Sequence, residues 1–222
     1  MQRTDRDPDT LNRPEGNDLE SNYEVHDIGQ AHVKTHCEHM GFVVEEWGID
    51  KRHESDSLIY DDKMDLKIHE HDQGDLPASG VDIERANLNL VAFLEVKTKR
   101  NEDWFGVINR RHLRKYLTQA HKSDVPAVIY MSLVDDTDEN EGQASIVRDT
   151  FIPIQRWDEL TKVMDGEYDY YPPEAADQFL IEQVDDYPLV ESTWRAPDGN
   201  QVVTLDVDQG LDWTEFTNLI YE

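Results

Sequence analysis

The segment LEVKTKR contains two side chains whose types and spacing suit phosphate chemistry. Glu95 and Lys97 stand two residues apart at the end of the apolar run LVAFL. Side chains two apart on a β-strand project from the same face. A carboxylate beside an ammonium can hold a metal-bound water and offset the charge that develops on a phosphate. The pair alone is equally consistent with an ordinary ion pair on a strand, so the surrounding sequence must decide between a catalytic and a structural role.

A second carboxylate, Asp65, lies in the segment 57–70, whose pattern predicts a β-hairpin. If the second strand of this hairpin neighbours the predicted strand 89–98, Asp65 can approach Glu95. Two carboxylates at one point suit Mg²⁺ or Mn²⁺, because such an ion takes about one or two carboxylates together with water and substrate phosphate. The backbone carbonyl of Val96 offers a further ligand.

Other side chains offer competing metal sites. A shifted hairpin register would bring Asp61 or Asp62 to the site in place of Asp65. The segment HEHD at 69–72 is a possible loop site. Three histidines fall at i, i+4 and i+7 of the first predicted helix, a spacing that can bind Zn²⁺: His32, His36 and His39. We prefer Asp65 with Glu95, because the strand and the cations that follow it favour that pair.

The elements expected to position these residues follow in the order helix, three strands, helix, strand. The first helix is predicted to begin at Asp27 as its N-cap and to end at Gly41. The remaining elements are predicted from hydrophobic periodicity at 42–48, 64–69, 89–98, 110–122 and 126–134. A strand, a crossover helix and a strand form a parallel unit. We therefore expect an α/β fold with a mixed central β-sheet flanked by helices.

The chain divides into three parts by composition. Residues 1–22 contain few large apolar side chains, which is typical of a disordered acidic arm. Residues 23–165 hold the predicted core. Residues 166–222 differ in character and form a C-terminal extension, with a possible hairpin around 198–200 and a helix at the end.

A helix, MDLKI, FLEVKTKR and a basic helix, in this order over residues 24–134, resemble the PD-(D/E)XK phosphodiesterase superfamily. The resemblance implies a restriction-endonuclease-like α-β-β-β-α-β core and a Mg²⁺-dependent DNA nuclease that leaves a 5′-phosphate. It makes Asp65 and Glu95 the metal ligands and Lys97 the catalytic lysine. The first helix, the Gly-Phe that follows it and the helix after the Lys resemble those of archaeal Holliday-junction resolvases, which implies an endonuclease of repair or recombination that works as a homodimer.

The sequence departs from that pattern at two places. Many relatives carry a Glu eleven residues before the Gly that ends the first helix, and here that position is Gln30. Exonuclease-like members have Gln-x-x-x-Tyr on the helix after the Lys, whereas HLRKY has His112 in place of the Gln and keeps Tyr116. Gln30 is expected to assist from the first helix, with His112 and Tyr116 as auxiliary residues. A catalytically inactive nucleic-acid-binding module of the same fold stays open as an alternative.

The composition is extremely acidic. The 222 residues contain 49 Asp and Glu against 21 Lys and Arg, of which nine are Lys, and the net charge is −28. An acidic, lysine-poor surface stays hydrated in concentrated salt, where repulsion between carboxylates is screened. We therefore expect a halophilic source, a haloarchaeon or one of its viruses. An acidic viral structural or interaction protein stays open as another alternative.

The cations gather in one region of the sequence. Residues 97–122 contain eight Lys and Arg but two acidic residues. DNA would be attracted to this region and repelled by the rest of the chain. The expected phosphate contacts are Lys99, Arg100, Arg110, Arg111, Arg114 and Lys115. A solvated helix face would show the same charges, but the neighbouring Glu95 and Lys97 favour DNA.

The sequence also bears on the cellular compartment. Cys37 is the single cysteine, so no disulfide framework is expected. Residues 1–22 lack the apolar core of a signal peptide, and no apolar run approaches the ~20 residues that span a bilayer. We expect a cytoplasmic protein without membrane contact.

Overall fold

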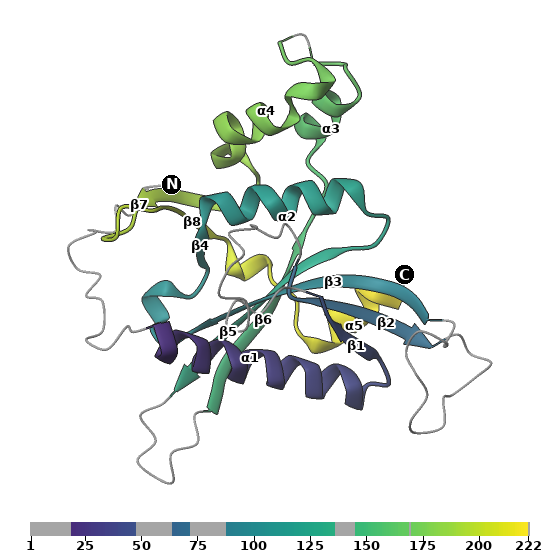
Figure 1. Cartoon of the computed structure of the whole chain (residues 1–222), viewed down its shortest axis with the longest axis vertical. Coiled ribbons are helices and arrows are strands. Elements are labelled where there is room, and N and C mark those ends of the chain that lie inside the picture. Colours follow the sequence, from purple (N-terminus) through teal and green to yellow (C-terminus); the bar gives the residue numbers. More distant parts are fainter. Residues whose placement is uncertain (1–18, 48–63, 72–87, 136–144, 169, 222) are drawn as a thin grey trace, which may run out of the picture.

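The computed structural model describes residues 19–47, 64–71, 88–135, 145–168 and 170–221. Helices and strands make up most of this length (Figure 1). The helices are α1 (Leu19–His39), α2 (Arg110–Lys122), α3 (Asp158–Met164), α4 (Ala176–Gln183) and α5 (Trp213–Tyr221). The strands are β1 (Val43–Glu46), β2 (Leu66–His71), β3 (Leu88–Lys99), β4 (Val107–Asn109), β5 (Ala127–Asp135), β6 (Ser145–Ile154), β7 (Val190–Arg195) and β8 (Gln201–Leu205). Short 3₁₀ turns lie at η3 (Glu102–Trp104), η4 (Pro173–Ala175), η5 (Val184–Asp186) and η6 (Val207–Gln209).

A mixed sheet forms the centre of the molecule. Within the described residues it has five strands in the order β1-β2-β3-β5-β6. β3 and β5 are parallel, and every other pair is antiparallel. α2 lies between β3 and β5 in the chain, as a parallel pair requires a crossover. The predicted α/β class with a mixed, helix-flanked sheet is confirmed.

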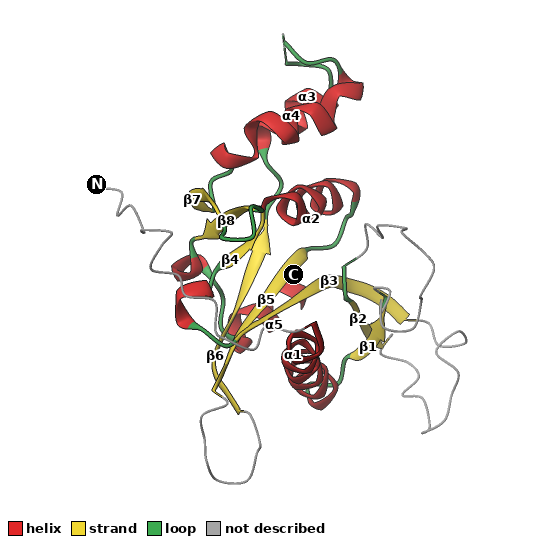
Figure 2. Ribbon diagram, turned by 60° about the vertical axis from the view of Figure 1, so that its left-hand side comes forward, coloured by secondary structure: helices red, strands yellow, loops and turns green. Residues whose placement is uncertain are grey.

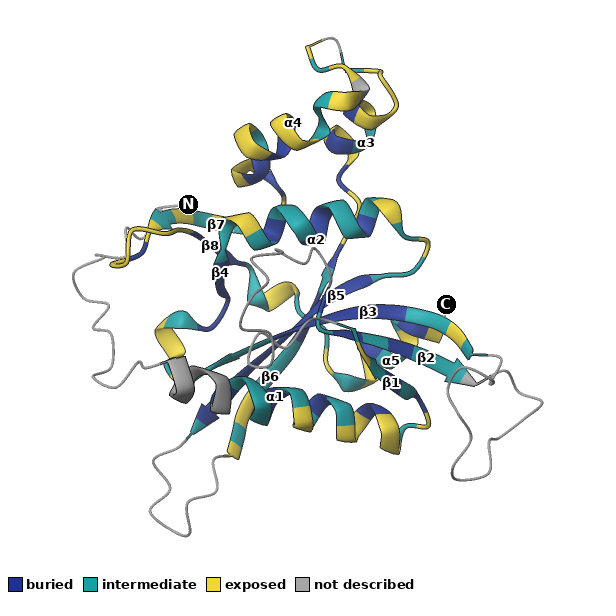
Figure 3. Cartoon of the chain, viewed as in Figure 1, coloured by how far each residue is buried: buried dark blue, intermediate teal, exposed yellow. Residues whose placement is uncertain are grey.

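Alternation along β3 creates two separate cores, one on each face of the sheet. Ala92, Leu94 and Val96 pack in the core that also contains residues of α1 and α5. Phe93 packs in the core of α2, α3 and α4. Glu95 and Lys97, two and four positions further on, therefore lie on the α2 face. Figure 2 shows α1 and α2 on opposite sides of the sheet, and Figure 3 shows the middle of β3 and most of β5 buried.

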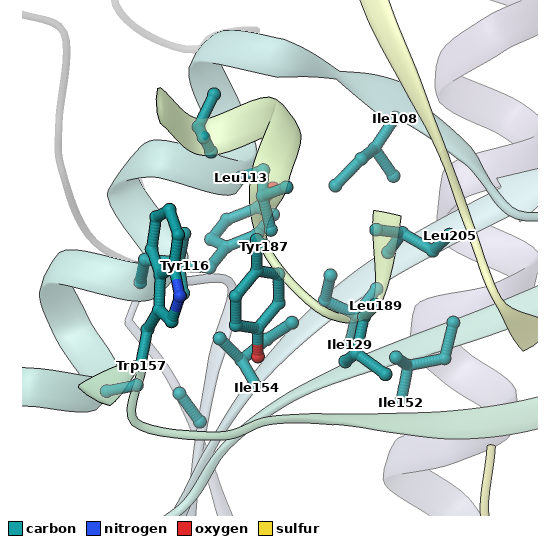
Figure 4. Close-up of a cluster of buried hydrophobic side chains, with 14 of the residues drawn as sticks. Ile108, Leu113, Tyr116, Ile129, Ile152, Ile154, Trp157, Tyr187, Leu189 and Leu205 are labelled. Atoms are coloured by element: carbon teal, nitrogen blue, oxygen red, sulfur yellow. The ribbon is translucent and has the colours of Figure 1, made fainter. Parts of the chain in front are cut away.

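α2 follows the sequence prediction closely. Its N-cap is Asn109, whose side chain accepts a hydrogen bond of 3.0 Å from the backbone N–H of Arg111. Its buried stripe packs against Ile129 and Trp157 (Figure 4). This stripe is the predicted set Leu113, Tyr116, Leu117 and Ala120. Apolar residues at i, i+3, i+4 and i+7 share one helix face, so the pattern alone fixes which side of α2 meets the sheet.

α1 is longer than the sequence predicted. The helix begins at Leu19 rather than at Asp27, because residues 19–26 contain no helix breaker and Val25 is buried in the fold. Its C-terminal end agrees with the prediction, since Gly41 has φ 92°, a left-handed conformation that favours glycine.

The C-terminal segment packs against both sheets. β7 and β8 form the predicted hairpin, and β8 also pairs with β4, which gives a three-stranded antiparallel sheet within the described residues. The sequence did not predict β4, because three residues are too few to show the alternating pattern of a strand. α5 lies on the α1 face, where the rings of Phe216 and Phe151 stack 4.0 Å apart. None of the helices built by the described residues is long and apolar enough to cross a membrane.

α1 packs closely against β3 at Gly29, which is buried. A Cβ atom placed at this position would overlap the hydroxyl of Thr98. Thr98 accepts a hydrogen bond of 3.0 Å from Ser132 on the neighbouring strand, so its side chain is held in place. Glycine is thus required here by the space between helix and sheet.

We predict that Gly29→Ala destabilises the protein, although Ala normally favours a helix over Gly by about 1 kcal/mol. Overpacking against Thr98 should lower the free energy of unfolding by about 1–3 kcal/mol. Urea unfolding in concentrated KCl measures the change. Thr98→Ala should restore the stability of Gly29→Ala, and a double variant as unstable as Gly29→Ala would contradict the steric explanation.

Candidate active site

Asp65 lies at the bend that leads into β2. The register pairs Leu66 with Leu94, so Asp65 stands next to Glu95 just before the first residue of β2. The backbone N–H of Val96 donates a 2.8 Å hydrogen bond to Asp65 Oδ2. This side-chain hydrogen bond replaces the backbone bond that Val96 would make if β2 extended back past Asp65. It fixes the Asp65 carboxylate beside the first residue pair of β2 and β3.

Glu95 is a buried carboxylate with two donors on one oxygen. Its side chain is 8 % exposed. Glu95 Oε1 accepts hydrogen bonds from Lys97 Nζ and, at 2.5 Å, from the hydroxyl of Tyr116 on α2. The structure therefore brings Asp65, Glu95, Lys97 and Tyr116 together. His112 lies one turn before Tyr116, and their ring centroids are 6.3 Å apart.

The charges of the site shift its protonation. Burial raises the pKa of Glu95, and the charge of Asp65 adds to this effect against the opposing influence of Lys97. For Lys97, burial favours the neutral form, but the carboxylates of Glu95 and Asp65 raise its pKa above the ordinary value. Burial and the adjacent Glu95 carboxylate likewise raise the pKa of Tyr116 well above its usual range. Glu95, Lys97 and Tyr116 thus hold their protons more firmly than they would in solution.

Asp65 behaves differently from Glu95. Burial acts to raise the pKa of Asp65, but the hydrogen bond from His26, the charge of Lys97 and the Val96 N–H outweigh it and lower the pKa. His26 Nε2 on α1 lies 3.5 Å from Asp65 Oδ2. The ionised form of Asp65 is therefore the one this environment stabilises.

Each carboxylate keeps one oxygen available. Among the described residues, Asp65 Oδ1 and Glu95 Oε2 accept no hydrogen bond, since the partners above use Oδ2 and Oε1. The carbonyl of Val96 points to the same side as its N–H, past the end of β2 toward Asp65. Two carboxylate oxygens and one carbonyl form a hard-oxygen set that suits Mg²⁺ completed by water and phosphate.

The two carboxylate oxygens and the Val96 carbonyl do not fill the coordination sphere of a metal ion by themselves. Within the part of the chain that the structure describes, no group of three His, Cys, Asp or Glu could hold a metal ion. Gln30 is half-buried on α1, one turn after His26, and no hydrogen bond joins it to Asp65 or Glu95 within those residues. The residue of α1 that reaches the site is His26, which the sequence did not predict. A histidine is a suitable partner for a carboxylate, but the pairing of His26 with Asp65 depends on how α1 crosses the sheet.

No competing metal site is assembled by the residues that the structure describes. Asp61, Asp62 and Asp72 lie outside the described residues. His69 belongs to β2 rather than to a loop, and its Nε2 contacts Glu45 Oε2 at 3.1 Å. The rings of His32 and His36 contact each other and Trp213 of α5. His32 Nε2 also lies 3.6 Å from Asp149 Oδ2, but among the described residues no group of three His, Cys, Asp or Glu is arranged to hold a metal ion.

The predicted cations divide into separate groups. Arg110 is bound to the C-terminal segment, because its Nε donates to Asp185 Oδ1 at 2.6 Å and its Nη2 to the carbonyl of Ile181 at 2.9 Å. Arg114 is one turn further along, where burial and the charge of Arg110 lower its pKa and the charge of Asp177 on α4 opposes them. Arg110 is thus engaged within the protein, and DNA contact by Arg110 and Arg114 stays a prediction.

The other predicted cations lie elsewhere. Arg111 and Lys115 lie opposite the buried stripe of α2 by helical periodicity. Lys99 is the last residue of the strand that carries Glu95 and Lys97, and Arg100 follows it.

Comparison with models of known protein families finds no match for the chain, and comparison with curated proteins finds none. The interpretation of the site therefore rests on its residues and their arrangement.

We predict that Tyr116→Phe is more destabilising than Tyr187→Phe. Both tyrosines are 3 % exposed, but the Tyr187 hydroxyl donates to the neutral carbonyl of Gln155 at 3.1 Å. A hydrogen bond to a charged group contributes about 1.5–3 kcal/mol, against about 0.5–1.5 kcal/mol for a neutral acceptor. Urea unfolding of both variants at about pH 8, where an ordinary carboxyl is ionised, measures the difference. Equal losses would show that the Tyr116 hydroxyl does not support an ionised Glu95.

Proposed function

We propose that this chain is a Mg²⁺-dependent nuclease that hydrolyses phosphodiester bonds of DNA. The observation that carries the proposal is the convergence of Asp65, Glu95 and Lys97 beside the start of β2, with one carboxylate oxygen of each acid available. An isolated ion pair of Glu95 with Lys97 would not require a second carboxylate beside it. Two further cations of this acidic chain, Lys99 and Arg100, follow directly after Lys97 in the sequence.

Residue roles follow from the surroundings of each side chain. Asp65 and Glu95, with the Val96 carbonyl, would hold the metal. Bound Mg²⁺ or Mn²⁺ would supply Lewis acidity toward the phosphate and lower the pKa of the attacking water. The raised pKa of Lys97 keeps its ammonium charged, which favours hydrogen bonding to a phosphate oxygen where negative charge develops, over accepting a proton.

The remaining residues position these groups. Tyr116 holds Glu95 Oε1, so that this carboxylate cannot rotate away from Lys97. His26 holds Asp65 from the other face of the sheet. Water would attack the phosphorus and the P–O3′ bond would break, which gives a 5′-phosphate and a 3′-hydroxyl. In this proposal His26, rather than Gln30, is the residue of the first helix that assists the site.

We also infer that the core belongs to the restriction-endonuclease-like class. The observed order α1-β1-β2-β3-α2-β5 supports this, with β4 inserted before α2. An endonuclease of repair or recombination, acting as a homodimer on branched DNA, is the most specific form of the proposal. It rests on the resemblance of the first helix and of the segment around Glu95 and Lys97.

A second candidate is a nucleic-acid-binding module of the same fold without turnover. Two observations favour it. The neutral Gln30 stands where many relatives have a carboxylate, and no third acidic ligand joins Asp65 and Glu95 within the described residues. Such a module would bind DNA and leave it intact.

Cleavage of supercoiled plasmid in Mg²⁺ or Mn²⁺ and concentrated KCl separates the two functions. We expect the unaltered chain to nick or linearise the plasmid, and Asp65→Asn and Lys97→Met to slow cleavage by about 10²–10³ or more. The loss should follow from the missing metal ligand in one variant and the missing cation in the other. Circular dichroism checks that both variants stay folded.

Two control variants match these substitutions in burial. Lys67, 21 % exposed against 20 % for Lys97, lies on the same face but pairs with Glu45 and stacks on Trp47. Asp149, 24 % exposed against 25 % for Asp65, lies on the α1 face. Lys67→Met and Asp149→Asn should keep cleavage. Binding without cleavage by the unaltered chain would support the second candidate, and neither binding nor cleavage would favour an acidic interaction protein.

A further inference from the structure

Lys99 continues the row of side chains that begins at the candidate active site. It lies two residues after Lys97 on β3 and therefore on the same face of the sheet. The register pairs Lys99 with Leu133 of β5, and Leu133 with Arg148 of β6. The irregularity in the β5–β6 pairing comes after Leu133. Lys99 and Arg148 thus share one rung and one face, although 49 positions separate them in the sequence.

The two cations differ from Lys97 in how their charge is balanced. Lys97 is bound to Glu95. Lys99 makes no hydrogen bond or ion pair with the described residues, and burial together with the charge of Lys97 lowers its pKa to about 8. A bound anion would stabilise its charged form. The surroundings of Lys99 therefore lack the counter-charge that a phosphate could supply.

Arg148 is held so that its charge faces solvent. Its guanidinium lies over the ring of Phe105, 4.4 Å from the centroid, and its Nη1 is 3.7 Å from Glu102 Oε1. Both side chains of this ion pair are exposed, Arg148 to 44 % and Glu102 to 77 %. An exposed pair of this kind contributes little to stability. A planar guanidinium fixed on an aromatic ring is suited to bind a phosphate through two parallel N–H groups.

We propose that Lys99 and Arg148 bind consecutive phosphates of the DNA strand whose scissile phosphate lies at Lys97. The inference rests on the proposed function, because the position of the scissile phosphate comes from it. The DNA strand would run along β3 from Glu95 toward η3 and then cross β5 to Arg148. This path lies away from α4, to which Arg110 is bound.

The spacing of the rows agrees with this path. Two residues along a strand span about 6.6 Å, comparable to the separation of neighbouring phosphates along a nucleic-acid strand. Two strands across the sheet span about 9.6 Å, within the combined reach of a Lys and an Arg side chain. Lys97, Lys99 and Arg148 therefore present successive positive charges to a backbone that carries one negative charge at each nucleotide.

Salt-dependent DNA binding in EDTA tests the inference without cleavage. A short fluorescein-labelled duplex is titrated with the full chain over a series of KCl concentrations, for Lys99→Gln, Arg148→Gln and the double variant. Losing one phosphate contact should reduce the magnitude of the slope of log affinity against log salt by about 0.9. We expect that reduction for each single variant and twice that for the double variant. Lys99→Arg should retain the original slope.

Two variants with the same charge change serve as controls. Lys162→Gln on α3 and Arg195→Gln on β7 replace exposed cations outside this face and should leave the slope unchanged. Slopes for Lys99→Gln and Arg148→Gln equal to those of the controls would overturn the inference, as would absence of DNA binding by the unaltered chain. Plasmid cleavage in Mg²⁺ separates the two proposals. Cleavage with unchanged slopes would overturn the phosphate path alone, and reduced slopes without cleavage would overturn the nuclease alone.

Discussion

A carboxylate buried in the middle of a sheet must be compensated, and the arrangement around Glu95 follows from that constraint. An ionised group without partners costs several kcal/mol or more to bury. Three elements supply what Glu95 needs. β3 provides Lys97 on the same face, α2 provides the hydroxyl of Tyr116, and β2 begins only after Asp65, which leaves the Asp65 carboxylate free to accept the Val96 N–H. The position of α2 over the sheet is thereby coupled to the charge state of the site.

Such a cluster is poorly suited to stability alone. A buried ion pair is often replaced by apolar residues without loss of stability, and here two carboxylates share one lysine. The arrangement raises the pKa of Glu95 and lowers that of Asp65. Acids with opposite shifts beside one cation are typical of sites that bind a further positive charge or a reacting group. A divalent cation would relieve the repulsion that the protein leaves uncompensated.

The C-terminal segment contributes to the site from a distance. β8 completes the small sheet with β4, directly before α2. The ion pair between Arg110 and Asp185 then ties the first turn of α2 to the segment after α4. Since α2 carries Tyr116, these contacts hold the helix that brings the hydroxyl to Glu95. Cations that looked like a DNA surface in the sequence are partly used in this attachment.

The sequence by itself determined the local elements and the candidate pair. Apolar periodicity specified α2 and its buried stripe, and the two-residue period of a strand placed Glu95 and Lys97 on one face. These features depend on neighbours within a few positions, so the chain order encodes them. Asp65 was a weaker prediction, because its place depended on a strand register.

Only the tertiary structure decided what meets across the elements. The contact of His26 with Asp65 depends on how α1 crosses β3 at Gly29, and the rung shared by Lys99 and Arg148 depends on the pairing of β5 with β6. The ion pair between Arg110 and Asp185 depends on how the segment around Asp185, 75 positions away in the sequence, packs against α2. Long-range pairings of this kind leave no periodic signal in one sequence, because each is set by packing of whole elements rather than by the residues beside it.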